Sequence, residues 1–359
     1  MSRLDPSIFR LPVERLRNGY YSDAYFTQTR DLLHQEGAHP RVTMQVFQKR
    51  GSKLGGIDEA VAVLKLAAGE RLADGRWREG WEDLEVLALH EGDQVAPREP
   101  VLQITGDYGL FAHLETVYLG SLARRTLIMN NVTEVVEAAN GKSILYFPAR
   151  HDHWLVQTGD GWAAHVAGAI GVSTDAQASW WGGRGSGTVP HGLIAAYGGD
   201  TVAAARVFAR HYGEQTNVTV LVDFENDSVT TALEVADALG EELWGVRLDT
   251  SETMVDRSLW EHMGEGRPTG VNEQLVHMVR NALDEAGHGH VRIVVSGGFD
   301  AARIRAFEAA DVPVDAYGVG SSLIRGQNDY TADVVLLDGE PVAKAGRHFR
   351  DSPRLQRVD

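Results

Sequence analysis

The stretch from Val291 to Ser322 has the residue types that bind a phosphate group. Two short apolar segments, VRIVVS and VDAYGV, each end in glycine and small hydroxyl residues, and a helical segment lies between them. Glycine lets backbone N–H groups approach an anion closely, and a following helix N-terminus adds a positive dipole. Two such strand ends in succession are typical of the phosphate site of a β/α barrel. The pattern therefore predicts a phosphorylated sugar or nucleotide as the ligand.

Charged residues end two earlier apolar segments. Asp223 ends TVLVD, and Arg247 and Asp249 end LWGVRLD. A carboxylate at such a position could hold ribose hydroxyls or Mg²⁺, and an arginine offers a planar fork to a carboxylate or phosphate. The alternative is an Asp–Arg salt bridge that closes the top of a barrel.

His191 follows the glycine-rich run GRGSGTVP and opens a helical run. Histidine suits nucleophilic or general-base work because its neutral imidazole is abundant near neutral pH. We expect His191 to lie at the end of a barrel strand, poised for such a role. The alternative is a flexible loop with a helix-capping histidine.

The segment FPARHDHW, residues 147–154, places Phe147, Arg150, His151 and His153 close together. An arginine near an aromatic ring favours the binding of a flat anionic ring, by charge pairing and stacking. The H-x-H spacing alone would suggest a metal, but no third ligand is evident nearby.

Apolar strands alternate with amphipathic helices from Ser143 onward, which predicts a parallel sheet buried on both faces. Residues 1–112 have mixed α and β patterns, and residues 113–139 are helical up to the stop signal Asn140–Gly141. We expect an α/β fold: an N-terminal α/β (α+β) domain at 1–112, a β/α barrel at 113–328, and a segment at 329–359 that returns to the N-terminal domain. A hairpin around Asp338–Gly339 is expected in that last segment.

The composition limits the class of protein. The 359 residues carry a net charge of −16, which argues against non-specific nucleic-acid binding because that requires a broad basic face. No apolar run approaches the ~20 residues of a membrane span, and the N-terminus lacks an apolar signal core. Cysteine is absent, so disulfides and thiolate sites are excluded. We expect a cytoplasmic protein.

These segments together resemble the nicotinate phosphoribosyltransferase family, which belongs to the type II phosphoribosyltransferases with nicotinamide and quinolinate relatives. The resemblance covers nearly the whole chain and depends on the order and spacing of many motifs. In chain order they are SDAYF, VTMQVFQKR, EPVLQITGDYGLFAHLET, FPARH, GVSTDAQAS, GTVPHGLI, GVRLDT, SGGFD, YGVGSS and DYTADVVLLDGEPVAKAGR. The resemblance implies an irregular β/α barrel whose N-terminal domain is rejoined by the end of the chain.

The family joins nicotinate to phosphoribosyl pyrophosphate (PRPP), giving nicotinate mononucleotide and pyrophosphate in NAD salvage. Many members couple this transfer to ATP hydrolysis through a phosphorylated histidine. The resemblance assigns that role to His191, in GTVPHGLI, where Thr188 is a further substrate contact. It also implies catalytic ribose and phosphate contacts for Arg247 and Asp249, with Asp223 as a weaker match that would hold Mg²⁺ through PRPP.

The base-binding residues follow from three other motifs. The resemblance implies that Arg150 contacts the ring substituent, that Phe147 stacks on the ring and that Asp175, in GVSTDA, lies near the base. Tyr25, in SDAYF, matches a tyrosine contributed across a dimer interface, so a homodimer or a larger assembly of dimers is implied. The 5′-phosphate cradle is implied to consist of Gly297, Gly298, Gly320 and Ser321.

Three alternatives remain. A relative could use nicotinamide, since one arginine can bind either ring substituent, or quinolinate, which would want more basic residues than FPARHDHW offers. A different phosphate-binding barrel such as an aldolase would want a lysine at a strand end, and none of the predicted strand ends carries one. A non-catalytic binding protein is disfavoured by the presence of His191, Arg247 and Asp249 together.

Overall fold

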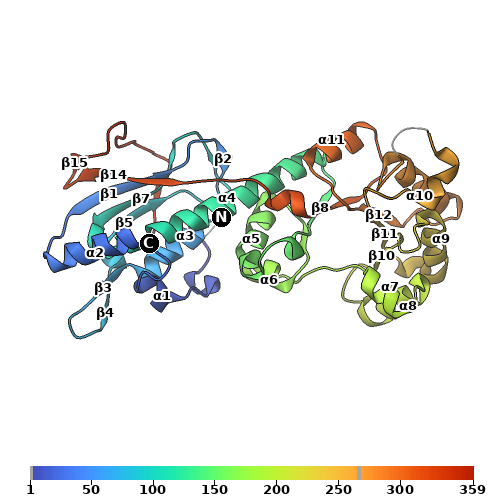
Figure 1. Cartoon of the computed structure of the whole chain (residues 1–359), viewed down its shortest axis with the longest axis horizontal. Helices are drawn as coiled ribbons and strands as arrows, with labels where there is room; N and C mark the ends of the chain where they lie inside the picture. Colours follow the sequence, from blue (N-terminus) through green and yellow to red (C-terminus); the bar gives the residue numbers. More distant parts are fainter. Residues whose placement is uncertain (1–2, 265–267) are drawn as a thin grey trace. The chain divides into compact units, whose positions relative to one another are not determined.

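The computed structural model describes residues 3–264 and 268–359, which form two compact units (Figure 1). Unit 1 consists of Met1–Asn130 and Gly326–Asp359, and unit 2 of Asn131–Arg325. The change from one unit to the other falls inside helix α4 (Glu115–Ala138), whereas the sequence pattern predicted it before that helix, at residue 112. A continuous helix carries no breaker that would mark such a boundary in the sequence.

Unit 1 is built on a six-stranded sheet in the order β15-β14-β1-β7-β5-β16, antiparallel throughout. The central strand β1 (Arg41–Phe47) pairs with β7 (Pro100–Asp107) on one side and with β14 (Thr331–Leu337) on the other. Strands β5 (Glu85–Ala88), β15 (Glu340–Pro341) and β16 (Gln356–Arg357) complete the sheet. The end of the chain therefore rejoins the N-terminal segment, and the hairpin at Asp338–Gly339 is confirmed.

Helix α3 (Ile57–Ala67) is the most buried helix of unit 1, and it packs in the core with apolar residues of β1, β5 and β7. Helices α1 (Val13–Arg17) and α2 (Ala24–Gln35), the first part of α4 and two small ribbons surround this core. The ribbons pair β2 (Ser52–Lys53) with β6 (Gln94–Val95) and β3 (Gly69–Arg71) with β4 (Trp77–Glu79).

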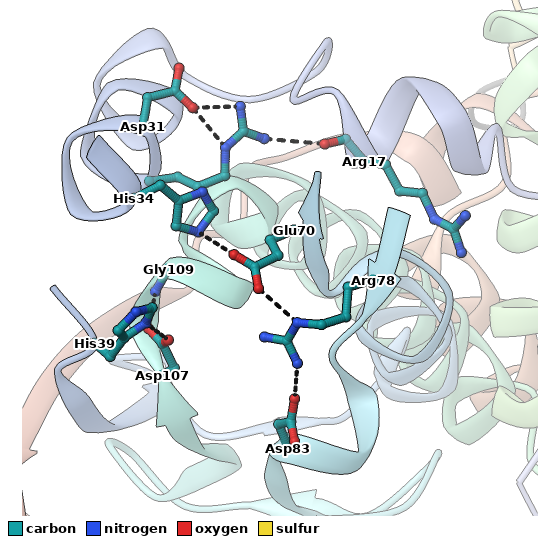
Figure 2. A network of polar contacts seen from close by, with 10 residues as sticks. Arg17, Asp31, His34, His39, Glu70, Arg78, Asp83, Asp107 and Gly109 are labelled. Carbon is teal, nitrogen blue, oxygen red and sulfur yellow. Dashed lines mark hydrogen bonds and ion pairs between the residues drawn. The ribbon is translucent and has the colours of Figure 1, made fainter. Parts of the chain in front are cut away.

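A polar network supports the β3–β4 ribbon and α2 (Figure 2). The Arg78 side chain in β4 donates to Glu70 at 2.7 Å and to Asp83 at 2.5 Å. In α2, Arg30 donates to Asp31 at 2.9 Å and to the carbonyl of Arg17 at 3.1 Å. These contacts tie neighbouring elements of unit 1 together.

Unit 2 contains a six-stranded, fully parallel sheet in the order β10-β11-β12-β13-β8-β9. The strands are β8 (Ser143–Tyr146), β9 (Gly171–Val172), β10 (Thr219–Leu221), β11 (Gly245–Leu248), β12 (Arg292–Val295) and β13 (Ala316–Val319). Nearly all residues of β10 to β13 are buried, as the continuous apolar runs predicted.

Helices follow these strands in the order expected for a β/α barrel. They are α5 (Gln157–Ala167), α6 (Asp175–Ala178), α7 (His191–Ala196), α8 (Thr201–Tyr212), α9 (Ser228–Leu239), α10 (Glu273–Glu285) and α11 (Ala301–Ala309). Helices α8, α9 and α10 lie beside β10, β11 and β12 (Figure 1). No helix in the described residues is long and apolar enough to span a bilayer.

The segment 185–189 joins the two edges of the parallel sheet. On one side, Ser186 N–H donates to the carbonyl of Val172 in β9 at 2.8 Å. On the other side, Val189 forms a parallel bridge with Val220 in β10, and its N–H donates to Thr219 at 2.8 Å. The sheet is thereby closed by a single extended segment, which makes unit 2 an irregular barrel.

Candidate active site

The candidate residues of unit 2 lie where its parallel strands end. Phe147 directly follows β8, Asp223 follows β10 by two residues, and Asp249 directly follows β11. Ser296 directly follows β12, and Gly320 directly follows β13. Because the carboxyl ends of parallel strands meet at one edge, the chain brings these residues to one face of the barrel.

Arg247, in β11, is held by three side chains from three parts of the barrel. Its Nε donates to Ser296 Oγ at 2.8 Å, one terminal nitrogen to Thr188 Oγ1 at 3.3 Å, and the other to Asp249 Oδ2 at 3.2 Å. The guanidinium also lies over the Phe147 ring, 5.3 Å from its centroid. A guanidinium has five N–H donors, so these bonds leave two for a ligand.

Ser296 is a further candidate residue, which the sequence analysis did not single out. The residue is buried, with 3% of its surface exposed, and its hydroxyl accepts from Arg247 and donates to Asp249 Oδ1 at 2.7 Å. Arg247, Ser296 and Asp249 therefore form a closed ring of hydrogen bonds. The parallel pairing of β11 with β12 could have identified Ser296. In that register, the hydroxyl at the end of VRIVVS lies beside the charged residues at the end of GVRLD.

His191 begins α7, and its Nε2 lies 2.9 Å from Oδ1 of the nearly buried Asp223. The hydrogen bond to Asp223 raises the pKa of His191; burial opposes this rise, as does the charge of Arg247, while Asp249 adds to it. The imidazole remains about half exposed. The carboxylate thus orients the ring and leaves Nδ1 as the second nitrogen, an arrangement suited to nucleophilic work.

Two turns at the ends of β12 and β13 present backbone N–H groups. Gly297 and Gly298 have φ angles of 86° and 74°, a left-handed conformation that favours glycine. Within the described chain, no acceptor is bonded to the N–H groups of Gly297, Gly298, Gly320 or Ser321. The Ser322 hydroxyl donates to the carbonyl of Phe299 at 2.9 Å and so joins the two turns. Consecutive backbone donors of this kind suit an anion such as a phosphate.

Arg150 contrasts with Arg247. It lies in the short 3-10 turn η5 (Ala149–His151), is exposed, and forms no hydrogen bond or ion pair with any described residue. Phe147 lies at the start of the same segment, and its N–H donates to Val319 in β13 at 2.8 Å. The ring that could stack on a base is thus fixed by the sheet, whereas the arginine is free to turn toward a ligand.

Asp175 and Thr188 lie near the closing segment of the barrel. Asp175 is the first residue of α6, and its Oδ1 accepts the N–H of Gly185 at 2.8 Å. Thr188 belongs to the site through its bond to Arg247. Asp175 therefore has a structural contact as well as its candidate role in the base pocket.

Tyr25 lies in α2 of unit 1, whereas all the other candidate residues lie in unit 2. Its side chain is 59% exposed, and its ring lies 4.3 Å from that of Phe26. The cluster at the strand ends of unit 2 is therefore built without Tyr25.

The carboxylates at the barrel face could bind a cation only together with ligand atoms from a bound substrate. No group of three or more His, Cys, Asp or Glu side chains within residues 3–264 and 268–359 could hold a metal ion. Asp223 uses one oxygen for His191 and Asp249 uses both for Ser296 and Arg247. Mg²⁺ commonly binds one or two carboxylates together with substrate phosphates, and Asp223 could serve as such a carboxylate.

The sequence model of a family described as "Quinolinate phosphoribosyl transferase, N-terminal domain" matches residues 23–126. Among solved structures, the chain is similar to nicotinate-nucleotide pyrophosphorylase from Pyrococcus furiosus. That likeness has 32% sequence identity and a TM-score of 0.78, and it covers 94% of this chain and 80% of the other. It extends over both units of the protein.

A nicotinate phosphoribosyltransferase of Mycobacterium tuberculosis is 32% identical over 272 residues, which are 73% of this chain and 56% of that protein. The chain thus spans little more than half the length of this curated relative. Human nicotinic acid phosphoribosyltransferase has a TM-score of 0.65 at 18% identity, over 90% of this chain and 76% of the human one, and so shares the fold.

Proposed function

This chain belongs to the nicotinate phosphoribosyltransferase family, and from that premise we propose that it joins nicotinate to PRPP, releasing nicotinate mononucleotide and pyrophosphate. One observation carries the proposal above all others. The ring of hydrogen bonds among Arg247, Ser296 and Asp249 lies at the same barrel face as two turns with unbonded N–H groups. A fixed cation, a fixed carboxylate and an anion cradle are what a phosphorylated sugar requires.

The reaction is a displacement at C1 of the ribose. A bond forms between C1 and the ring nitrogen of nicotinate, the C1–oxygen bond to pyrophosphate breaks, and pyrophosphate leaves with the electron pair. The ring nitrogen has a lone pair and needs no deprotonation, so positioning dominates over acid–base chemistry. Arg247 and Asp249 hold fixed charges where the sugar becomes cationic and the leaving group becomes more anionic.

Mg²⁺ is proposed to arrive with PRPP and to rest against Asp223. Such an ion would neutralise charge on the leaving pyrophosphate. The protein's own part is to orient the Asp223 carboxylate, which it does through the hydrogen bond to His191.

Arg150 is proposed to pair with the carboxylate of nicotinate while Phe147 supports the ring. Arg150→Ala should raise the KM for nicotinate roughly tenfold to a hundredfold, the cost of a hydrogen bond to a charged group, and change the KM for PRPP much less. Arg305→Ala is a control, because Arg305 lies in α11 and its side chain forms an exposed pair with Glu134 at 3.1 Å. An equal effect of Arg150→Ala on both substrates would remove Arg150 from the base pocket.

His191 is proposed to accept a phosphoryl group from ATP. Its Nε2 faces Asp223, so attack on the γ-phosphate would use Nδ1, and ADP would leave with the bonding electron pair. His191→Ala should abolish acid-labile, alkali-stable labelling by γ-labelled ATP and should abolish ATP hydrolysis. Labelling that persists in this variant would show that another residue is the acceptor.

Tyr25 is proposed to complete the site of a second copy of the chain in a homodimer. The proposal is supported by its exposed ring in unit 1 and by the SDAYF motif. Tyr25→Ala should lose product formation and His191→Ala should lose ATP hydrolysis, and mixing the two proteins should restore ATP-stimulated product formation, because a mixed dimer then has one intact site. No recovery after demonstrated subunit exchange would contradict a shared site.

The decisive experiment is a product assay with PRPP and each of nicotinate, nicotinamide and quinolinate. Nicotinate should give nicotinate mononucleotide and pyrophosphate at the highest kcat/KM. Quinolinate is the second candidate because the matching family model carries its name, and its use would release CO₂ along with the same mononucleotide. Turnover of quinolinate alone would replace the proposed substrate, and turnover of none would refute the proposed function.

A further inference from the structure

His151 lies directly against the turn that follows β13. Strands β8 and β13 are parallel neighbours with Tyr146 opposite Val319, so the residues after β8 run beside Gly320. A hydrogen bond of 2.8 Å from the N–H of His151 to the carbonyl of Pro148 closes a tight turn in that segment. The turn brings the imidazole back over the glycine.

The approach of the imidazole to Gly320 is close. A Cβ atom at position 320 would lie 3.0 Å from Cε1 and 3.4 Å from Nδ1 of His151. Only glycine leaves room for the ring at this distance without a shift. The edge of the ring that carries Nδ1 therefore faces the backbone whose N–H groups, at Gly320 and Ser321, have no described acceptor.

Two basic side chains near the turns, Arg247 and Arg303, are already bonded to the protein. Residues 131–325 contain one lysine, Lys142, which precedes β8 at its opposite end and pairs with Glu308 at 2.8 Å. Arg303 donates to the carbonyls of Gly297 and Val271, and Arg247 is held by three side chains. The carboxylate of Glu252 lies against Gly298, so of the two turns the one at Gly320 is more favourable to a phosphate.

We propose that His151 binds the 5′-phosphate of PRPP, with its imidazole donating a hydrogen bond to a phosphate oxygen held by the Gly320 and Ser321 N–H groups. This inference rests on the proposed function. Phosphate recognition is then shared between backbone donors, which fix position, and one side chain, which adds a directed hydrogen bond. The histidine that follows Arg150 thus works on the sugar phosphate, while Arg150 works on the base.

The test uses the full chain with ribose 5-phosphate and with pyrophosphate as separate probes in calorimetry. His151→Phe keeps an aromatic ring against Gly320 but removes the donor, and His151→Arg restores a cationic donor. His151→Phe should weaken ribose 5-phosphate binding and raise the KM for PRPP, each roughly tenfold, and leave pyrophosphate binding and the KM for nicotinate unchanged. His151→Arg should recover most of the loss.

The matched control is His153→Asn, two residues away. His153 stacks on Trp154 and its side chain accepts the N–H of Leu155, a bond that asparagine can keep. This variant should bind both probes as the parent does. Equal ribose 5-phosphate affinity in the parent and His151→Phe would overturn the inference, while the proposed function would stand as long as the parent forms product. A parent protein that neither binds nor turns over PRPP would refute the proposed function, and this inference with it.

Discussion

Charged side chains gather at the carboxyl ends of parallel strands in unit 2, whereas in unit 1 they link neighbouring surface elements or are buried. Arg247 and Asp249 of unit 2 keep about a fifth of their surface exposed although several bonds hold them. In unit 1, Glu70, Arg78 and Asp83 brace a small ribbon (Figure 2), and Glu91 is buried with two backbone N–H donors, those of Gly56 and Asp58.

This difference between the units shows that charged side chains serve two purposes in the protein. A fixed charge that remains in contact with solvent can exchange water for an anionic ligand, so it serves binding and catalysis. A charge that braces an element or is buried serves the fold, and its protonation is linked to stability. Substitutions of Arg247, Ser296 or Asp223 at the strand ends of unit 2 should therefore change kinetics with little effect on stability, and substitutions at Glu91 should do the reverse.

The largest expected effect is that of Arg247→Lys. Lysine keeps the charge but loses the planar fork that bonds Ser296, Thr188 and Asp249, so kcat/KM should fall at least about a hundredfold. Steady-state kinetics check this, with Arg305→Lys as control, because Arg305 forms an exposed pair with Glu134 at 3.1 Å, away from the strand ends. A fall of less than about threefold would show that charge alone suffices at this position.

Asp223→Asn should change the pH dependence of ATP hydrolysis. Asp223 raises the pKa of His191, so the neutral, nucleophilic imidazole forms only at higher pH, and hydrolysis should increase as pH rises through that pKa. Removing the carboxylate lowers the pKa and should move the increase to lower pH. Rate profiles together with NMR titration of the His191 ring measure both shifts. Unchanged profiles would show that the Asp223–His191 bond does not govern the reaction.

Ser296→Ala should reduce kcat/KM roughly tenfold, because Arg247 and Asp249 lose the hydroxyl that fixes both. A double-mutant cycle with Asp249→Asn distinguishes positioning from a general packing defect. If Ser296 acts through Asp249, the two losses will not add. Additive losses would assign Ser296 to packing only.

The smallest kinetic effect and a clear stability effect are expected for Glu91→Gln. Burial, with the nearby charge of Asp58, raises the pKa of Glu91 to about 8. A carboxyl whose pKa is raised by folding stabilises the protein at low pH, and this contribution is lost as pH rises through the folded value. The melting temperature of the parent should therefore fall between mildly acidic pH and pH above 8, more than that of Glu91→Gln. Parallel melting profiles would contradict the assignment, and kcat/KM should match the parent.

The sequence predicted the barrel strands and which residues lie at their ends, because buried parallel strands form continuous apolar runs and the residue after each run is placed by register alone. Asp249, Gly297 and Gly320 were found in this way. Ser296 was missed because a single serine has no pattern of its own, and its role depends on the neighbouring strand. The sequence also left the bonding partner of Asp223 undecided. Asp223 bonds His191, 32 residues earlier in the chain, rather than Arg247.

The sequence did not predict that the segment 185–189 closes the barrel, because its contacts are with residues distant in the chain. Its glycines indicate a flexible loop, yet its bonds reach Val172 and Thr219, residues that adjoin different edges of the sheet. The unit boundary at Asn130 likewise falls within an uninterrupted helical pattern. Local patterns thus predict elements, whereas closure and domain division depend on contacts between residues distant in the chain.

The closing segment 185–189 links the folding of the barrel to the formation of the candidate site. Thr188 belongs to the segment and His191 follows two residues after its end, so the contacts of these side chains with Arg247 and Asp223 depend on the segment pairing with β10. Joining distant edges carries a loop-closure cost that is met late in the assembly of a barrel. A newly synthesised chain in which this segment is still unpaired would therefore lack both contacts, and under the proposed function the onset of turnover would report that the barrel has closed.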